Sequence, residues 1–175
     1  EDGVELWVAD AGTGQAKAIP AIRLNDVLAD PFSWMSDHQR LLVRILPKDR
    51  GAPPASPRVP VGPNVEETAG KMSQMATFQD LLKDPHDEEL FQYYATAQLA
   101  VADASTGAAI LVGDPGMFLS AGFSPDERYL LVTKLKRPFS YRVPYFFFSR
   151  STEVWDAKGN RVAAIADLPV SDEVP

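Results

Sequence analysis

The most regular feature of the sequence is an alternation of apolar and polar residues that breaks at a repeated turn. Residues 4–19 (VELWVADAGTGQAKAI) and 97–112 (AQLAVADASTGAAILV) alternate as half-buried strands do, break at Asp-Ala-x-Thr-Gly and resume as a second apolar run. The glycines that close this motif, Gly14 and Gly107, suit positive φ, and its aspartate can cap the turn. The pattern predicts a β-hairpin in each stretch, with a weaker third copy at 152–165.

A second repeated unit is a polar corner followed by a short apolar run. Residues 31–46 (PFSWMSDHQRLLVRIL) and 121–135 (AGFSPDERYLLVTKL) share this arrangement. In the second copy Pro125 presets φ and Asp126 can cap the turn. We expect a tight turn between neighbouring strands, followed by a strand at 130–132 that is buried on both faces.

The two kinds of unit alternate along the chain. Leu6 and its equivalent Leu99 lie 93 residues apart, whereas the next matched pair, Val101 and Val154, lies 53 apart. Small β units that recur at about 40 to 50 residues are typical of the four-stranded blades of a β-propeller. The sequence therefore predicts an all-β fold, a partial β-propeller of antiparallel strands.

The longer first interval contains an insertion, residues 48–96, that fits no strand pattern. Its proline-dense part, 47–63, predicts extended chain. Short helices are predicted at about 78–95, and Asp84-Pro85 supplies an N-cap and a first-turn proline for the second of them. That helix would either line an entrance over the propeller face or cover a sheet edge.

Without the insertion roughly 125 residues remain, about three blade equivalents, whereas four to eight blades close a propeller. We therefore treat residues 1–175 as a single partial propeller domain. The chain starts at Glu1 and stops at Pro175 within an acidic stretch, so we expect it to belong to a longer protein. Otherwise its open strand edges would pair with a second copy.

Composition narrows the classes of partner and chemistry. A net charge of −7 disfavours nucleic acid and anionic membranes, and no apolar stretch is long enough to span a bilayer. The chain has no cysteine, which excludes disulfides, thiolate metal sites and a cysteine nucleophile. We expect no cofactor.

Catalytic and metal motifs are also missing from the sequence. Phe118 stands where a Gly-x-Ser-x-Gly elbow around Ser120 would need its first glycine, and neither histidine, His38 or His86, has a paired nucleophile. The acidic group at 86–89 is explained by the dipole at a helix N-terminus. We therefore predict no catalytic residue and no metal site within the chain.

One segment suggests binding. Residues 136–150 (KRPFSYRVPYFFFSR) interleave arginines with six aromatic residues, and two prolines prevent a regular central strand. Two interpretations stay open. In the first, the aromatics pack into the blade core with the arginines at the rim; in the second, Arg137 or Arg142 holds a substrate carboxylate by a charge-assisted contact. Tyr141 and Tyr145 complete the candidate substrate-binding set.

Several stretches together resemble a known family. They are RVPVGPNV (58–65), TFQDLLKDPHDEELFQYYATAQL (77–99), SPDERYLLV (124–132), RPFSYRVPY (137–145), EVWDAKGN (153–160) and ADLPVSDEVP (166–175). They resemble the β-propeller region of glutamyl-endopeptidase-like members of the prolyl oligopeptidase family, serine peptidases of bacteria and plant plastids. The second and fourth stretches are the most specific, whereas SPDERYL is shared by many propellers.

The resemblance implies a function for the longer protein. It implies a propeller that gates and docks peptide substrates for a C-terminal α/β-hydrolase domain, whose Ser, Asp and His triad lies outside this chain. It also implies cleavage after Glu, with either an exported or periplasmic location in a bacterium or a plastid location in a plant. The rival hypothesis is a non-enzymatic propeller that binds a protein or ligand, like translocation-associated periplasmic propellers with the same Ser-Pro-Asp corner.

Overall fold

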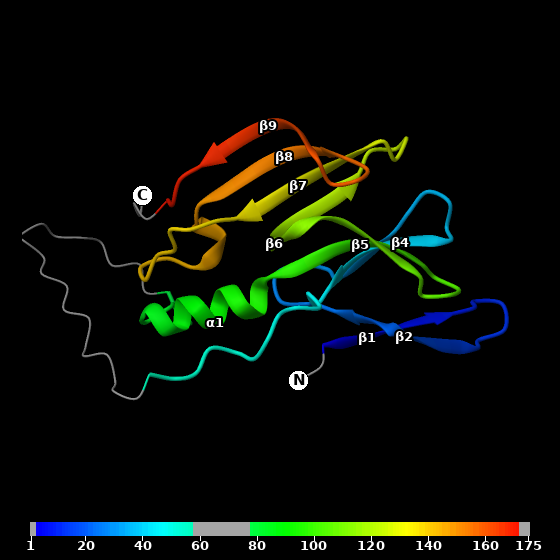
Figure 1. The fold of residues 1–175 in the computed structure, drawn as a ribbon, viewed down its shortest axis with the longest axis horizontal. Helices are drawn as coiled ribbons and strands as arrows, with labels where there is room; N and C mark the ends of the chain where they lie inside the picture. The colour runs from blue at the N-terminus through cyan, green and yellow to red at the C-terminus, as the bar shows by residue number, and fades with distance from the viewer. Residues whose placement is uncertain (1–2, 58–77, 172–175) are drawn as a thin grey trace, which may run out of the picture.

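The structure is a computed structural model that describes residues 3–57 and 78–171. In these residues nine β-strands pair antiparallel in an open arrangement, with one α-helix (Figure 1). The elements are β1 (Val4–Ala9), β2 (Ala16–Leu24), β3 (Phe32–Trp34), β4 (Arg40–Ile45), α1 (Pro85–Ala95), β5 (Ala97–Asp103), β6 (Ala109–Phe123), β7 (Tyr129–Leu135), the 3-10 turn η1 (Tyr145–Phe147), β8 (Arg150–Asp156) and β9 (Arg161–Leu168). The all-β prediction is therefore supported.

The strands group into an N-terminal hairpin, β1–β2, and two meanders of four strands each among the described residues. The first meander is β3, β4, β5 and the first part of β6, and the second is the rest of β6 with β7, β8 and β9. β6 belongs to both meanders because its 15 residues are enough to pair with a different strand along each half. It pairs with β5 as far as Gly116 and with β7 from Met117 onward.

All three predicted hairpins are present, and the aspartate that opens each turn is its cap. The Oδ1 of Asp103 accepts hydrogen bonds from the backbone N–H groups of Ser105 (2.9 Å) and Thr106 (2.7 Å) and from both hydroxyls. Asp10 binds its own turn in the same way through Gly12 and Thr13. These hydrogen bonds lower the pKa of Asp103, and the bond from the Ser105 hydroxyl makes the largest contribution.

The two polar corners adopt one and the same turn. Asp37 and Asp126 each accept backbone N–H groups two residues on, and the residue after each aspartate has positive φ: His38 at 54° and Glu127 at 55°. Arg40 in turn lowers the pKa of Asp37 to about 2, with backbone N–H groups adding to the effect. His38 is thus a turn residue, and its positive φ is a backbone conformation that only a few per cent of non-glycine residues adopt.

The corners also bind each other across the two meanders. Glu127 Oε1 accepts hydrogen bonds from the Ser36 backbone N–H (2.9 Å) and the Ser36 hydroxyl, and Glu127 Oε2 accepts one from Arg40 Nη2 (2.7 Å). The Ser36 hydroxyl makes the largest contribution to a lowered pKa of Glu127. This bridge fixes one end of the second meander against the equivalent end of the first.

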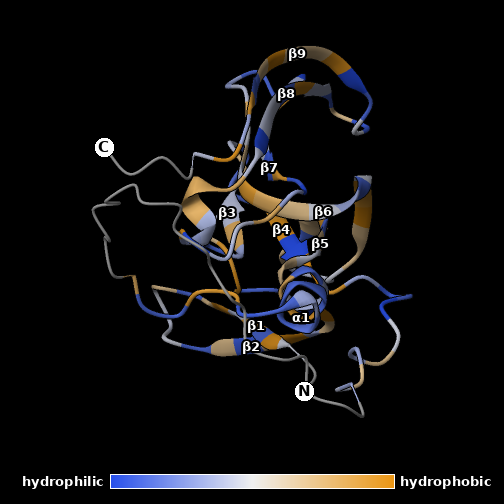
Figure 2. Ribbon diagram, turned by 90° about the vertical axis from the view of Figure 1, so that its left-hand side faces the viewer, coloured by the Kyte–Doolittle hydropathy of each residue, from blue (hydrophilic) through white to orange (hydrophobic). Residues whose placement is uncertain are grey.

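The β4–β5 layer lies between the other two groups of strands, as the edge-on view of Figure 2 shows. On one face of β4, Leu41 and Val43 join a buried cluster with Ile19 and Ile22 of the N-terminal hairpin. On the other face, Leu42 joins a second cluster built mainly with the second meander. The main members of that cluster are Leu99, Val112, Phe118, Leu130, Val132 and Trp155. The apolar run of β4 is therefore buried on both sides, as expected for this kind of strand.

The run in β7 differs from this expectation. Leu130 and Val132 are fully buried, but Leu131 between them is 52% exposed. Its register partner on β8 is Val154, which faces the same side of the sheet. The outer face of the second meander thus carries an apolar patch around Leu131 and Val154 that no described residue covers.

The insertion connects two strands that are direct neighbours, since β4 pairs with β5 along its whole length. α1 begins as predicted: the Asp84 side chain accepts the Asp87 N–H (2.9 Å), and Pro85 opens the first turn. Helix at 78–84 was predicted wrongly, because Asp80 has a φ of 58° that breaks the helical path. Residues 47–57 carry neither helix nor strand, while the rest of the proline-dense stretch and Thr77 lie outside the described residues.

Substitution of Gly107 tests the packing of the hairpin turn. Gly107 has a φ of 75°, and an added Cβ would lie 2.6 Å from the Cγ2 of the buried Ile19. We expect Gly107→Ala to lower the free energy of unfolding by about 2 to 5 kcal/mol, the sum of left-handed backbone strain and overpacking. Chemical denaturation followed by tryptophan fluorescence measures this change.

The equivalent turn supplies a matched control. Gly14 has a similar φ of 71° but no atom within 4 Å of an added Cβ. Gly14→Ala should therefore cost only the backbone strain, about 1 to 2 kcal/mol. Equal losses for the two variants would contradict the contact between the β5–β6 turn and β2.

Candidate functional site

The aromatic segment predicted as a binding region packs against the insertion helix. Phe139 and Phe148 stack with ring centroids 5.2 Å apart, and Phe91 of α1 contacts both rings edge-on at 5.3 and 5.8 Å. Ala95, at the end of α1, is buried in the same cluster. The aromatics of 136–149 thus hold the helix to the end of the second meander, where α1 and η1 lie in Figure 1.

Arg137 forms the polar part of this contact. Its Nη1 donates to the carboxylate of Glu88, its Nε donates to Gln92 Oε1 (2.9 Å), and its guanidinium lies 4.7 Å from the Phe139 ring centroid. Two of the donors predicted to hold a substrate carboxylate are therefore used within the chain. Arg137 still lines a cavity beside α1, so it contributes positive charge there.

The structure brings Tyr141 to the same carboxylate. Burial, followed by the hydrogen bond to Glu88, raises the pKa of Tyr141 to about 12, so its hydroxyl stays protonated and donates to Glu88. Tyr145 contacts Phe91 with centroids 6.3 Å apart. Arg142 is exposed, and its side chain makes no hydrogen bond or ion pair with the described residues.

The cavity beside α1 has a volume of about 550 Å³. Its lining residues are Pro47, Asp49, Arg50, Glu89, Gln92, Tyr93, Thr96, Pro115 and Arg137. The Arg50 guanidinium stacks 3.9 Å from the Tyr93 ring centroid, and its Nε is buried without a partner among the described residues. Positive and negative side chains both line this cavity, so it suits a polar peptide segment better than an apolar ligand.

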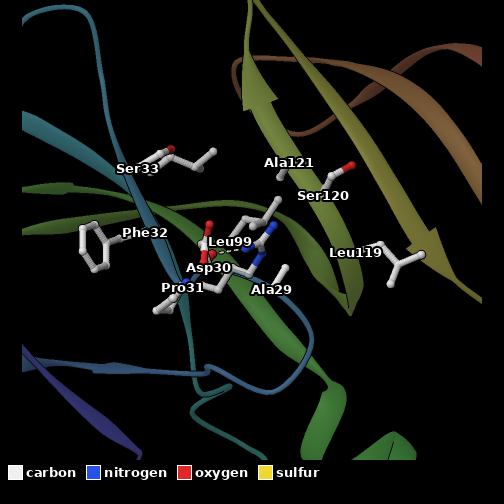
Figure 3. Close-up of a pocket in the computed structure, with 11 residues that line it drawn as sticks. Ala29, Asp30, Pro31, Phe32, Ser33, Leu99, Leu119, Ser120 and Ala121 are labelled. Atoms are coloured by element: carbon white, nitrogen blue, oxygen red, sulfur yellow. Dashed lines mark hydrogen bonds between the residues drawn. The ribbon is translucent and has the colours of Figure 1, made fainter. Parts of the chain in front are cut away.

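A second cavity, of about 260 Å³, lies where the two meanders meet (Figure 3). Arg44 is among its lining residues. Sequence reasoning missed both Arg44 and Arg50. A signal for Arg44 was present, because it is the one charged residue between Leu41 and Leu46 in an otherwise apolar run. Such a residue must either turn out to solvent or find partners inside the protein.

Among residues 3–57 and 78–171 no group of three or more potential ligands could hold a metal ion. Glu88, from the acidic group at the start of α1, instead pairs with Arg137, and His86 Nε2 lies 3.5 Å from the Ser56 hydroxyl. The described part of the chain also has no helix that is both long and apolar enough to cross a bilayer.

These features define an antiparallel all-β region with a docked helical insertion. No family model matches the chain. It is 39% identical over 176 residues to "Probable glutamyl endopeptidase, chloroplastic" of Oryza sativa subsp. japonica, and 41% identical over 175 residues to the protein of the same name from Arabidopsis thaliana. The matches cover 98% and 97% of the chain.

The chain spans 18% of the length of each of these relatives. It is therefore similar, along almost all of its sequence, to one part of two larger proteins whose names describe a peptidase. This bears out the glutamyl-endopeptidase part of the resemblance found in the sequence.

The contacts of Arg137 generate a stability prediction. Arg137→Met removes the ion pair, the hydrogen bond to Gln92 and the cation–π contact, so we expect a loss of about 1 kcal/mol and faster amide exchange in α1. Arg142→Met, at an exposed arginine five residues away, should change stability by less than about 0.5 kcal/mol. Thermal denaturation and hydrogen–deuterium exchange measure both effects, and equal exchange rates in α1 of the two variants would refute the docking role.

Proposed function

We propose that the chain is a non-catalytic part of a β-propeller in a serine peptidase of the prolyl oligopeptidase family. In this role it docks peptide substrates and restricts access to a catalytic domain outside residues 1–175. The observation that carries the proposal is the similarity of nearly the whole chain to two proteins named glutamyl endopeptidase. By that similarity the longer protein cleaves peptides after Glu.

The strand arrangement supports the propeller part of the proposal. Blades are four-stranded antiparallel meanders that stack face to face, and the last strand of one leads into the first strand of the next. β6 makes this kind of transition between the two meanders, and β4–β5 is buried on both faces. The N-terminal hairpin then corresponds to the two outer strands of a preceding blade.

The candidate site supports the docking part. Arg142 is exposed, and its positive charge has no ion-pair partner among the described residues. Tyr145, three residues later on η1, is partly exposed. Arg137 and Tyr141 are held on Glu88, at the helix that closes this end of the sheet. In this proposal Arg142 attracts acidic peptides, while Arg137 and Tyr141 position the insertion that borders their path.

Labelling with a fluorophosphonate tests the enzymatic part. In the native full-length protein we expect a single modified serine, located by mass spectrometry outside residues 1–175, because a triad serine is nucleophilic only when its histidine base is positioned. Heat-denatured protein is the control and should stay unlabelled. The absence of any adduct in the folded protein would instead favour the non-enzymatic binding propeller.

Cysteine accessibility tests the propeller part separately. Leu131→Cys in the full-length protein should react slowly with a maleimide, because a further layer of strands covers the apolar face that carries it. Lys158→Cys, in the exposed β8–β9 turn of the same meander, should react fast, and Leu130→Cys should be protected. Peptide mapping reads each site, and equal rates at 131 and 158 would contradict the stacking of another blade there.

A further inference from the structure

A buried arginine lies against the cavity between the two meanders. Arg44 is 8% exposed, and its register partner on β5 is Leu99, so its side chain lies on the face of the sheet that packs against the second meander. Figure 3 shows 29–33 and 119–121 on opposite sides of this cavity. The lining residues are Ala29, Asp30, Pro31, Phe32, Ser33, Leu42, Arg44, Leu99, Leu119, Ser120 and Ala121.

The hydrogen-bonding capacity of Arg44 is mostly unused. Nη1 donates to the backbone carbonyl of Asp30, and this is the one hydrogen bond that its guanidinium makes with the described residues. Nε is buried without a partner, and no described carboxylate lies within ion-pair distance. A buried arginine without a counter-charge is strongly unfavourable, so an anion at this point would relieve a real cost.

The lining of the cavity favours one class of anion. Arg44 is the one basic residue of the lining, and Asp30 already contributes a negative charge, so a carboxylate with one negative charge meets less repulsion there than a phosphate carrying nearly two. Ser33 and Ser120 also line the cavity, and their hydroxyls make no hydrogen bonds with described residues. At about 260 Å³ the cavity lies below the roughly 300 to 1,000 Å³ of drug-sized ligand sites, so it suits a small group.

We propose that this cavity binds a carboxylate group on the Nε and Nη2 edge of Arg44. This edge matches the two oxygens of a carboxylate, and Nη1 stays on the Asp30 carbonyl. Because Nε is not open to solvent, the guanidinium must turn slightly when the ligand enters. A free dicarboxylic acid and the acidic side chain of a peptide both carry this group, and the second source rests on the proposed function.

Asp30 modulates the site. Its exposed carboxylate lies outside ion-pair distance of Arg44 but close enough for its charge to act on the guanidinium, partly offsetting the effect of burial, which lowers the pKa of Arg44. The negative charge of Asp30 therefore competes with a bound carboxylate. Asp30→Asn should tighten binding, which is opposite in sign to the effect expected if Asp30 merely held Arg44 in place.

Calorimetric titration of the full-length protein tests the proposal. The probes are glutarate, the peptide acetyl-Ala-Glu-Ala-amide, and its Gln counterpart as the uncharged control. We expect saturable binding of a carboxylate probe, no binding of the Gln peptide, and at least tenfold weaker affinity in Arg44→Met. Arg128→Met, at an exposed arginine outside the cavity, should bind like the unchanged protein.

The outcomes separate the two sources. Binding of glutarate alone supports a site for a free acid, and binding of the Glu peptide supports recognition of an acidic side chain. If neither probe binds, or if Arg44→Met binds as tightly as the unchanged protein, the proposal is overturned. Should Arg44→Met fail to fold, the sign of the Asp30→Asn effect still decides, because a preference for Glu over Gln alone is also expected of a catalytic site that cleaves after Glu. Because the Glu peptide would be a substrate of the proposed peptidase, the titration uses protein whose reactive serine is already blocked with the fluorophosphonate, or the untreated protein if no adduct forms. The heat then reports binding without turnover, and its failure is distinct from failure of the serine-labelling experiment.

Discussion

The burial of both faces of the β4–β5 layer is the constraint on which the rest of the structure depends. Val43 packs against the N-terminal hairpin, while Leu42, its neighbour in sequence, packs against the second meander. Because successive strand residues point to opposite faces, a slip of one residue in β4 would exchange the two clusters. The register with β5, continuous from Arg40 to Ile45, therefore positions both outer groups of strands and directs Arg44 between the meanders.

The sequence predicts best those features whose cause is local. The turn at Asp103 and the start of α1 at Asp84 are decided by a side chain that binds backbone N–H groups two or three residues away, so their patterns could be recognised. The helix expected from residue 78 failed because Asp80 adopts a left-handed φ that no local pattern announces. The exposure of Leu131 was missed for another reason. An apolar run predicts that both faces of a strand are buried, but it does not show whether the residues that bury them belong to the same chain segment.

The candidate site illustrates the same limit. Arg137 was identified from a cluster of charge and aromatic rings, but its partners Glu88 and Gln92 come from the insertion, more than forty positions earlier in the chain. Pairing of this kind depends on where the helix docks, and the docking depends on Phe91 and its stacked partners. Arg44, the one charged residue between Leu41 and Leu46, gave a weaker sequence signal than Arg137, yet its guanidinium has fewer hydrogen-bond partners.

The shared strand β6 has a mechanical consequence. The two meanders are joined by the uninterrupted backbone of β6, which pairs with β5 in its first part and with β7 in the rest, and the Glu127 bridge joins them again at the corners. The N-terminal hairpin has no such strand, and a single register pair, Leu24 with Ile45, joins β2 to β4. Under load the stack should therefore part first at the seam between β2 and β4, and the two meanders should move as one stiff body.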